Sequence, residues 1–404
     1  MTGLGIAAAI GTGVDEFAAA LRDGVAGIAS VAIDGLGTVP GAPLPSLDWT
    51  ARAGGAEART VLRAAPRSSA VAAAVAAEAA HAARLDDVEP EARALLIAGN
   101  NLHPAYGQEH HRRFLERPAY VNPRYALTFP DTYALAVVSE LRACRGPGFV
   151  AGGGFASGNV ALGQALALLR AGDADVCLVV APPSDYGALE RRAFANLGAA
   201  AAEVDDPASA CRPFDRSATG FVPGEGGAAL VLESLAHARA RSVPVLAELL
   251  CVAVVLQGRN DAAADSATEV RAMRLALRKG GLAASDVDYV SAHATSTPQG
   301  DAAEASAIDA VFGPDAHPVV NATKALTGHA LTAAAAVEAV AVILQLREGY
   351  VHANPQLRDP VDPPLRHARA TALRPERLRT ALSNAFSMGG IATSAAFAAY
   401  EATA

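Results

Sequence analysis

Two histidines occupy positions from which they could stabilise negative charge on a substrate oxygen. His293 follows a predicted strand and precedes a run of hydroxyl residues that includes Thr295 and Thr297. Catalytic groups of α/β sheets usually stand at the carboxyl ends of strands. His329 follows Gly328 at the predicted start of a helix, where the helix dipole disfavours protonation of the imidazole. Two neutral imidazoles that converge on a carboxylate or thioester oxygen would stabilise a developing enolate.

A lysine and a glutamate accompany the second histidine. Lys324 begins the segment that contains His329, and Glu338 lies farther along it, so we expect Lys324 to pair with Glu338. Each histidine taken alone is better explained as a hydrogen-bonded core residue. The motifs around the histidines favour a chemical role for both.

The elements that must position these residues alternate between strands and helices, which indicates a layered α/β fold with largely buried strands. A capping box is expected at Ser266 and Glu269, a weak break near 235–245 divides the chain into halves 1–235 and 236–404, and residues 102–145 look irregular. Strands are predicted at 2–10, 94–98, 148–151, 176–180, 228–232, 245–256, 288–292, 318–321, 379–385 and 391–400. Helices are predicted at 14–22, 68–85, 157–170, 235–241, 266–279, 301–312 and 330–347.

Composition excludes several classes of protein. The chain has 404 residues, of which 51% are hydrophobic and 18% charged, so it is not a disordered protein. A net charge of −8 and an aromatic content of 5% argue against nucleic-acid binding. The longest apolar stretch, 243–257, contains Glu248 and is too short to span a bilayer. The amino-terminal segment lacks the basic residues of a signal peptide and the four cysteines are widely spaced, so we expect a cytoplasmic protein.

We expect neither a metal nor a cofactor. His103, His110 and His111 lie near Glu109 but do not form the H-E-x-x-H spacing of a zinc site. Residues 224–229 match the loose dinucleotide pattern G-x-G-x-x-A, yet they precede a predicted strand instead of following one.

Four motifs in order carry a resemblance to a known family. They are R-P-F-D…G-F-V-P-G-E-G at 212–226, H-A-T-S-T at 293–297, K-A-L-T-G-H at 324–329 and N-A-F-S-M-G-G at 384–390. The chain resembles, from residue 2 to residue 400, the β-ketoacyl synthases of the thiolase superfamily, which elongate chains in fatty-acid and type II polyketide synthesis. The resemblance implies a thiolase fold: two similar α/β halves in a five-layered α-β-α-β-α sandwich.

The chain departs from this family at the nucleophile. The family pattern is G-P…-T-A-C-x-S-G, in which the cysteine heads a helix and takes the acyl chain as a thioester. Phe155 occupies the cysteine position here, and neither Cys144 nor Cys177 falls in an equivalent place. Ser157 has the ordinary serine position of the family and lacks the G-x-S-x-G context of a serine nucleophile. Phe155 therefore either fills an abandoned pocket or shapes the mouth of a site still in use.

The fourth motif departs from the family pattern N-x-F-G-F-G-G at Ser387 and Met388. The resemblance places Met388 where the family supplies an oxyanion-hole amide, and its backbone N–H could still be in place. Asn384 and Phe386 are expected to support that loop.

Loss of the cysteine leaves three functions open. The first is a chain-length-factor-like subunit, inactive alone, that pairs with a cysteine-bearing ketosynthase as a heterodimer and bounds the acyl tunnel in type II polyketide (including polyene) or fatty-acid-like elongation. The second is a malonyl-carrier-protein decarboxylase that uses His293 and His329, since these histidines drive loss of carbon dioxide in the family. The third is a non-catalytic homodimer that binds an acyl chain or a carrier protein.

An acyl carrier protein is an expected partner. Residues 102–140 are locally basic through Arg112, Arg113 and Arg117. This segment is expected either to receive the acidic carrier protein or to be a plain surface loop.

Overall fold

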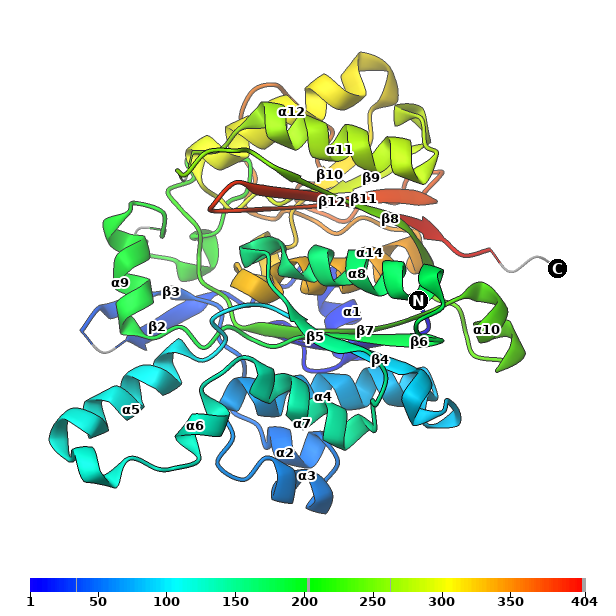
Figure 1. Ribbon diagram of the computed structural model, residues 1–404. Coiled ribbons are helices and arrows are strands. Elements are labelled where there is room, and N and C mark those ends of the chain that lie inside the picture. The colour runs from blue at the N-terminus through cyan, green and yellow to red at the C-terminus, as the bar shows by residue number, and fades with distance from the viewer. Residues whose placement is uncertain (34, 202–203, 262, 402–404) are drawn as a thin grey trace.

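Two five-stranded sheets form the core of the computed structural model, which describes residues 1–401 except 34, 202–203 and 262 (Figure 1). The first sheet has the strand order β1–β7–β6–β4–β5, with β1 at Gly3–Ala8, β4 at Arg93–Ala98, β5 at Gly148–Ala151, β6 at Val176–Ala181 and β7 at Gly226–Glu233. The second has the order β10–β9–β11–β12–β8, with β8 at Ala247–Leu256, β9 at Tyr289–Ser291, β10 at Val319–Asn321, β11 at Thr380–Ser387 and β12 at Ile391–Ala399.

The two sheets share one pattern of strand directions. In the first, β4 runs parallel to β5 and β6, and β7 runs antiparallel to β6 and β1. In the second, β9 runs parallel to β10 and β11, and β12 runs antiparallel to β11 and β8. The predicted duplication of an α/β unit is therefore confirmed, whereas the exact boundary at residue 235 stays a prediction.

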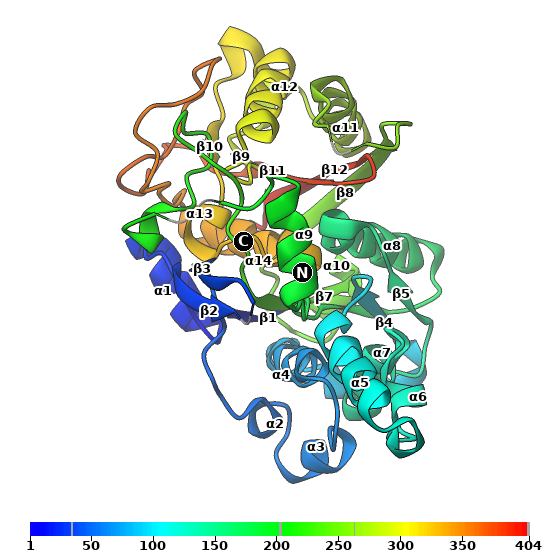
Figure 2. The same cartoon turned by 90° about the vertical axis from the view of Figure 1, so that its left-hand side faces the viewer.

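Helices separate and cover the sheets (Figures 1 and 2). The helices α4 (Arg67–Ala82) and α7 (Thr132–Arg142) pack below the first sheet, and α11 (Ser266–Gly280) and α12 (Pro298–Ala316) pack above the second. Between the sheets lie α8 (Ser157–Ala171) and α14 (Ala334–Glu348). A helix packed on all sides must be largely apolar, and α14 is buried from Ala334 to Leu346, with Glu338 and Gln345 as its polar exceptions. The five-layered sandwich is confirmed.

Small side chains let the two central helices touch. A Cβ atom added to Gly158 of α8 would lie 2.4 Å from the backbone nitrogen of Ala336 in α14. This close contact fixes the amino-terminal end of α8, where Phe155 lies in the 3₁₀ turn η4 (Gly154–Ala156).

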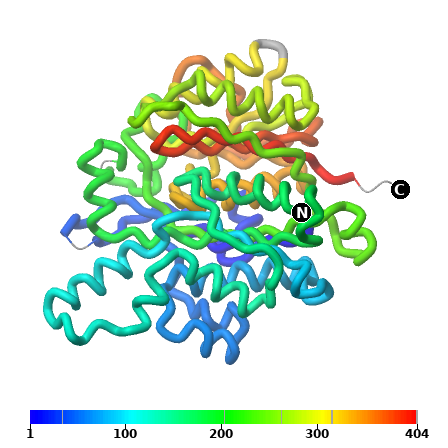
Figure 3. The backbone as a smooth tube through the Cα atoms, in the orientation of Figure 1, coloured from blue at the N-terminus to red at the C-terminus, as the bar shows by residue number. Residues whose placement is uncertain are grey.

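The remaining elements surround the sandwich, and the tube in Figure 3 shows the blue and cyan segments below and the yellow and red segments above. The other strands and α-helices are β2 (Ala29–Ile33), β3 (Gly37–Gly41), α1 (Val14–Asp23), α2 (Trp49–Arg52), α3 (Ala56–Val61), α5 (Pro104–Glu116), α6 (Tyr125–Thr128), α9 (Ala188–Asn196), α10 (Leu235–Ala240) and α13 (Lys324–Thr327). The other 3₁₀ turns are η1 (Leu85–Asp87), η2 (Pro90–Ala92), η3 (Pro118–Tyr120), η5 (Pro207–Ser209), η6 (Ala284–Asp286) and η7 (Leu331–Ala333). No helix in the described part of the chain is long and apolar enough to cross a membrane.

The prediction of an irregular segment at 102–145 is wrong. It contains α5, α6 and α7. The sequence of α5 is mostly polar and the helix has no buried residue, so it lacks the apolar periodicity that predicts a helix. Arg112 pairs with Glu116 at 2.6 Å and Arg113 pairs with Glu109 at 2.7 Å, so much of the local positive charge is compensated. His103, expected in a solvated loop, is buried, and its Nδ1 lies 2.8 Å from Ser68 Oγ.

Two further local predictions need correction. The capping box at Ser266 and Glu269 is wrong, because Asp265 is the N-cap of α11 and its carboxylate accepts a hydrogen bond from the Thr268 N–H. The single helix predicted at 330–347 is divided into the turn η7 and α14. His329 consequently precedes a 3₁₀ turn instead of heading an α-helix.

Candidate active site

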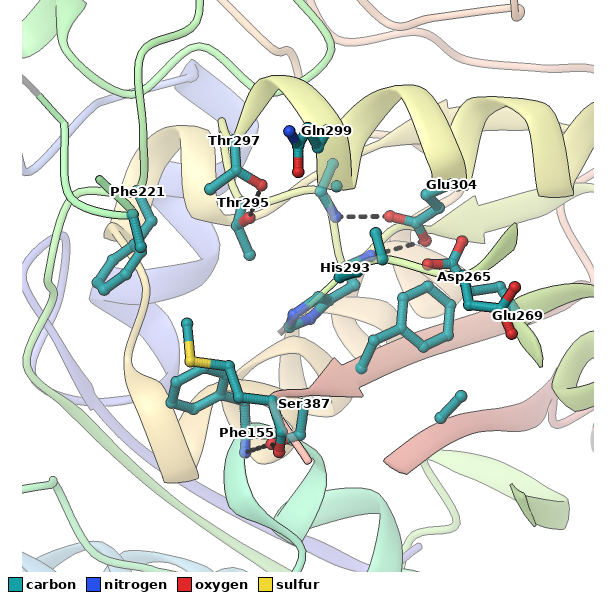
Figure 4. Close-up of a pocket in the computed structure, with 18 of the residues that line it drawn as sticks. Phe155, Phe221, Asp265, Glu269, His293, Thr295, Thr297, Gln299, Glu304 and Ser387 are labelled. Carbon is teal, nitrogen blue, oxygen red and sulfur yellow. Dashed lines mark hydrogen bonds between the residues drawn. The ribbon is translucent and has the colours of Figure 1, made fainter. Parts of the chain in front are cut away.

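One cavity of about 580 Å³ brings most of the predicted site residues together (Figure 4). Its wall includes both histidines, the two threonines of the third motif and the aromatic residue at the cysteine position. These and the other wall residues used below are Phe155, Phe221, Glu269, His293, Thr295, Thr297, Glu304, His329, Phe386, Ser387 and Met388. The Lys324, Glu338 and Asn384 side chains are buried behind this wall.

Hydrogen bonds set the same tautomer on both histidines. The ammonium of Lys324 has only donors and lies 3.3 Å from Nδ1 of His293, so Nδ1 accepts and the imidazole proton belongs on Nε2. The Leu331 N–H donates to Nδ1 of His329 at 3.2 Å, which again leaves the proton on Nε2. Nε2 of His329 is buried without a hydrogen-bond partner among the described residues. Both rings can therefore offer an N–H to the cavity, with centroids 5.5 Å apart.

Burial keeps both imidazoles neutral. Desolvation, together with the nearby charge of Lys324, lowers the pKa of His293 and of His329 well below the usual 6.5. The lysine is neutralised in turn by Glu338, with which it forms a short buried ion pair. Burial raises the pKa of Glu338 to about 7, and the attraction of Lys324 opposes that rise.

The motif at 212–226 fixes the position of His329. Its backbone N–H donates to Val222 O at 2.8 Å, and its carbonyl accepts from the Gly224 N–H at 2.8 Å. The Phe221 ring packs edge-on against the imidazole with centroids 5.4 Å apart. The segment 212–226 thus contributes to the site by holding the second histidine, and Phe221 is a wall residue that sequence reasoning did not single out.

A buried carboxylate fixes the loop after β9. The Glu304 side chain accepts from the backbone N–H groups of His293 at 2.9 Å and Ala294 at 2.7 Å. Asn384 Nδ2 donates to the same carboxylate at 3.1 Å, and the Phe386 ring packs on His293 with centroids 5.6 Å apart. These contacts link Asn384 and Phe386 to the histidine loop.

The two threonines meet beside this loop. Thr295 Oγ1 and Thr297 Oγ1 lie 2.9 Å apart on the cavity wall. The Thr295 N–H also donates to Asp301 at 2.9 Å. The pair therefore offers hydroxyl groups to a polar part of a ligand.

Phe155 packs against the site at the head of α8. It is 9% exposed, and its ring meets His329 edge-on with centroids 4.6 Å apart. Its backbone N–H donates to Ser387 Oγ at 3.0 Å (Figure 4). Cys144 and Cys177 lie outside the cavity wall, and burial raises their thiol pKa values to about 11 and about 12. Neither thiol is poised to form the thiolate that nucleophilic attack requires.

Glu269 is a cavity residue that was assigned to a cap. Its side chain is buried, and its Oε2 has no hydrogen-bond partner among the described residues. Burial, reinforced by the negative charge of Glu304, raises the pKa of Glu269 to about 9. The spacing of Glu269 from Ala272, Met273 and Ala276 could have indicated its burial, because all four residues lie on one buried face of α11.

No group of three or more histidine, cysteine or acidic side chains within the described ranges is arranged to hold a metal ion. The groups that face the cavity are instead imidazole N–H donors, hydroxyls, aromatic rings and carboxyl groups.

Comparisons with known proteins identify the family. Residues 1–238 match "Beta-ketoacyl synthase, N-terminal domain" and residues 246–358 match "Beta-ketoacyl synthase, C-terminal domain". The chain is 30% identical to the polyketide biosynthesis malonyl-ACP decarboxylase PksF of Bacillus subtilis (strain 168), over 97% of this chain and 94% of the relative.

Solved structures agree with this family. A ketosynthase complex with a type II polyketide synthase acyl-carrier protein and the ishigamide ketosynthase/chain length factor each superpose with a TM-score of 0.89. They are 28% and 27% identical to this chain, and each match covers 99% of this chain and 98% of the solved chain. With both family domains matched in order around one cavity, the chain belongs to the β-ketoacyl synthase family.

Proposed function

We propose that this protein decarboxylates a malonyl thioester carried by an acyl carrier protein, without forming an acyl-enzyme. The observation that carries the proposal is the pair of neutral imidazoles, His293 and His329, whose Nε2 protons are available at one cavity. The similarity to the malonyl-ACP decarboxylase PksF over nearly the whole chain supports the same reaction.

The proposed reaction needs donors and no nucleophile. The thioester carbonyl oxygen accepts hydrogen bonds from both Nε2–H groups. The bond between the carboxylate carbon and the methylene carbon breaks, carbon dioxide leaves, and the electron pair forms an enolate whose oxygen the imidazoles stabilise. Water then protonates the methylene carbon, which gives the acetyl thioester. Phe155 cannot attack a thioester, so the reaction stops there.

The cavity wall favours loss of the charged group. Phe155, Phe221 and Phe386 place aromatic carbon near the histidines, where a carboxylate loses hydration. An apolar surrounding disfavours the carboxylate relative to neutral carbon dioxide. The hydroxyls of Thr295 and Thr297 are proposed to hold the polar arm that bears the thioester.

The test is the mass of a malonyl-loaded acyl carrier protein incubated with this chain alone. We expect loss of carbon dioxide well above the rate without the protein. His293→Ala and His329→Ala should each slow it by about 100-fold or more, the usual loss for one oxyanion donor. His111→Ala, an exposed substitution on α5, is the control and should change nothing. A rate equal to the uncatalysed one rejects the proposal.

A non-condensing partner subunit is the second candidate. It is favoured by Phe155 at the nucleophile position and by the similarity to the ishigamide ketosynthase/chain length factor. Co-expression with a cysteine-bearing ketosynthase distinguishes the candidates. Stable co-purification without decarboxylation by this chain would support the subunit, whereas a homodimer inert toward the malonyl thioester would support a binding protein.

A further inference from the structure

The hydroxyl of Ser387 accepts a hydrogen bond from the backbone N–H of Phe155, the residue at the nucleophile position. Oγ of Ser387 accepts the Phe155 N–H at 3.0 Å (Figure 4). The same hydroxyl donates to Met388 O at 3.2 Å, so both its acceptor and its donor are engaged. An N–H at the head of a helix that faces a cavity would otherwise be a donor for a ligand oxygen. Here a side chain from the end of β11 takes that donor.

Gly154 makes room for this hydroxyl. A Cβ atom at residue 154 would lie 2.0 Å from Ser387 Oγ, far inside van der Waals contact. The chain has glycine at 154, where the family pattern T-A-C has alanine, and serine at 387, where the family pattern F-G-F has glycine. The two departures compensate each other in space and accompany the third, Phe155.

We infer that Ser387 is a positioning residue. Its hydroxyl engages the Phe155 N–H, so a thioester oxygen cannot accept a hydrogen bond from this amide and accepts hydrogen bonds from His293 and His329 instead. This inference deepens the proposed function and rests on it for the orientation of the malonyl thioester. Loss of the cysteine is then only part of the change. A thiol restored at residue 155 would still lack the N–H of its own residue as a donor for the oxyanion that forms when it attacks a carbonyl.

The test restores the thiol with and without Ser387. In Phe155→Cys, the thiol attacks the carbonyl of acetyl-N-acetylcysteamine, the acetyl group moves to the cysteine sulfur, and N-acetylcysteamine leaves with the thiol proton. Intact mass gives the acylation rate. The alkylation rate with iodoacetamide gives the reactivity of the thiol in a displacement that forms no oxyanion. The ratio of acylation to alkylation therefore reports the amide donor.

We expect this ratio to rise about tenfold or more when Ser387→Gly or Ser387→Ala is added to Phe155→Cys. Phe155→Cys/Ser383→Ala is the matched control, because it removes a hydroxyl from the same strand away from the Phe155 amide, and its ratio should equal that of Phe155→Cys. An unchanged ratio in both Ser387 variants, with melting temperatures near that of Phe155→Cys, overturns the inference. Decarboxylation by the unaltered chain is measured separately, so failure of the proposed function is distinguishable.

Discussion

At the scale of single residues, one buried ammonium organises the candidate site. Lys324 sets the tautomer of His293 through Nδ1 and helps to lower the pKa of both histidines. Its own burial is tolerated because Glu338 neutralises it. The ion pair therefore has a structural and a chemical consequence, which substitutions can separate.

Lys324→Met leaves Glu338 buried without its partner and should lower the free energy of unfolding by about 3 kcal/mol. Lys324→Met/Glu338→Leu removes both charges and should recover most of that loss in urea unfolding. Both variants should decarboxylate more slowly than the wild type, because neither retains the ammonium that sets the His293 tautomer. A double variant that is stable and fully active would show that the ammonium has no part in the reaction.

Glu269 predicts a dependence of stability on pH. Its folded pKa of about 9 lies above the unfolded value of 4.5, so the folded state retains a proton that the unfolded state releases as pH rises from 5 to 9. The carboxyl group therefore lowers the free energy of unfolding progressively over this range, by about 1 kcal/mol per pH unit. Glu269→Gln should be increasingly stabilising relative to wild type at higher pH in thermal melts. Exposed Glu140→Gln is the control, and parallel pH profiles for all three proteins would contradict the burial argument.

At the scale of elements, the contact between α8 and α14 sets the floor of the site. Phe155 lies directly before α8, and η7 after His329 leads into α14, so the packing of the two helices determines how the ring meets the imidazole. Their separation depends on Gly158, whose missing side chain lets α8 approach the Ala336 backbone.

Gly158→Ala tests this contact. Alanine is a better helix former than glycine by about 1 kcal/mol, yet the added methyl group meets backbone at 2.4 Å and must push the helices apart. We expect a net loss of about 2 kcal/mol in urea unfolding and slower decarboxylation. Gly107→Ala on α5, where the nearest atom would be 3.6 Å away, should be neutral or stabilising. Equal effects of both substitutions would mean that the helices adjust freely.

At the scale of the whole molecule, the sequence predicts the layers better than it predicts the site. Alternating strands and helices predict a layered α/β fold, and the family resemblance carried by the four motifs implies the duplicated sandwich and brings His293 and His329 into one site. The contact between Ser387 and the Phe155 amide joins residues that are 232 positions apart, and no local pattern reveals such a contact. The spacing of Glu269 from Ser266 predicts a capping box, but the packing of α11 directs the Glu269 side chain toward the cavity.

The edge of the first sheet predicts association with a second subunit. Among the residues that the structure describes, the strand β5 pairs only with β4; it contains no charged residue and leaves Phe149 37% exposed. Such an uncharged edge can pair with another chain. We expect light scattering to give about twice 40.9 kDa for the purified chain, and Phe149→Asp to shift it toward the monomer. Val254→Asp, 45% exposed on the β8 edge of the other sheet, should leave the mass unchanged, whereas an unaffected assembly in Phe149→Asp would exclude β5 from the interface.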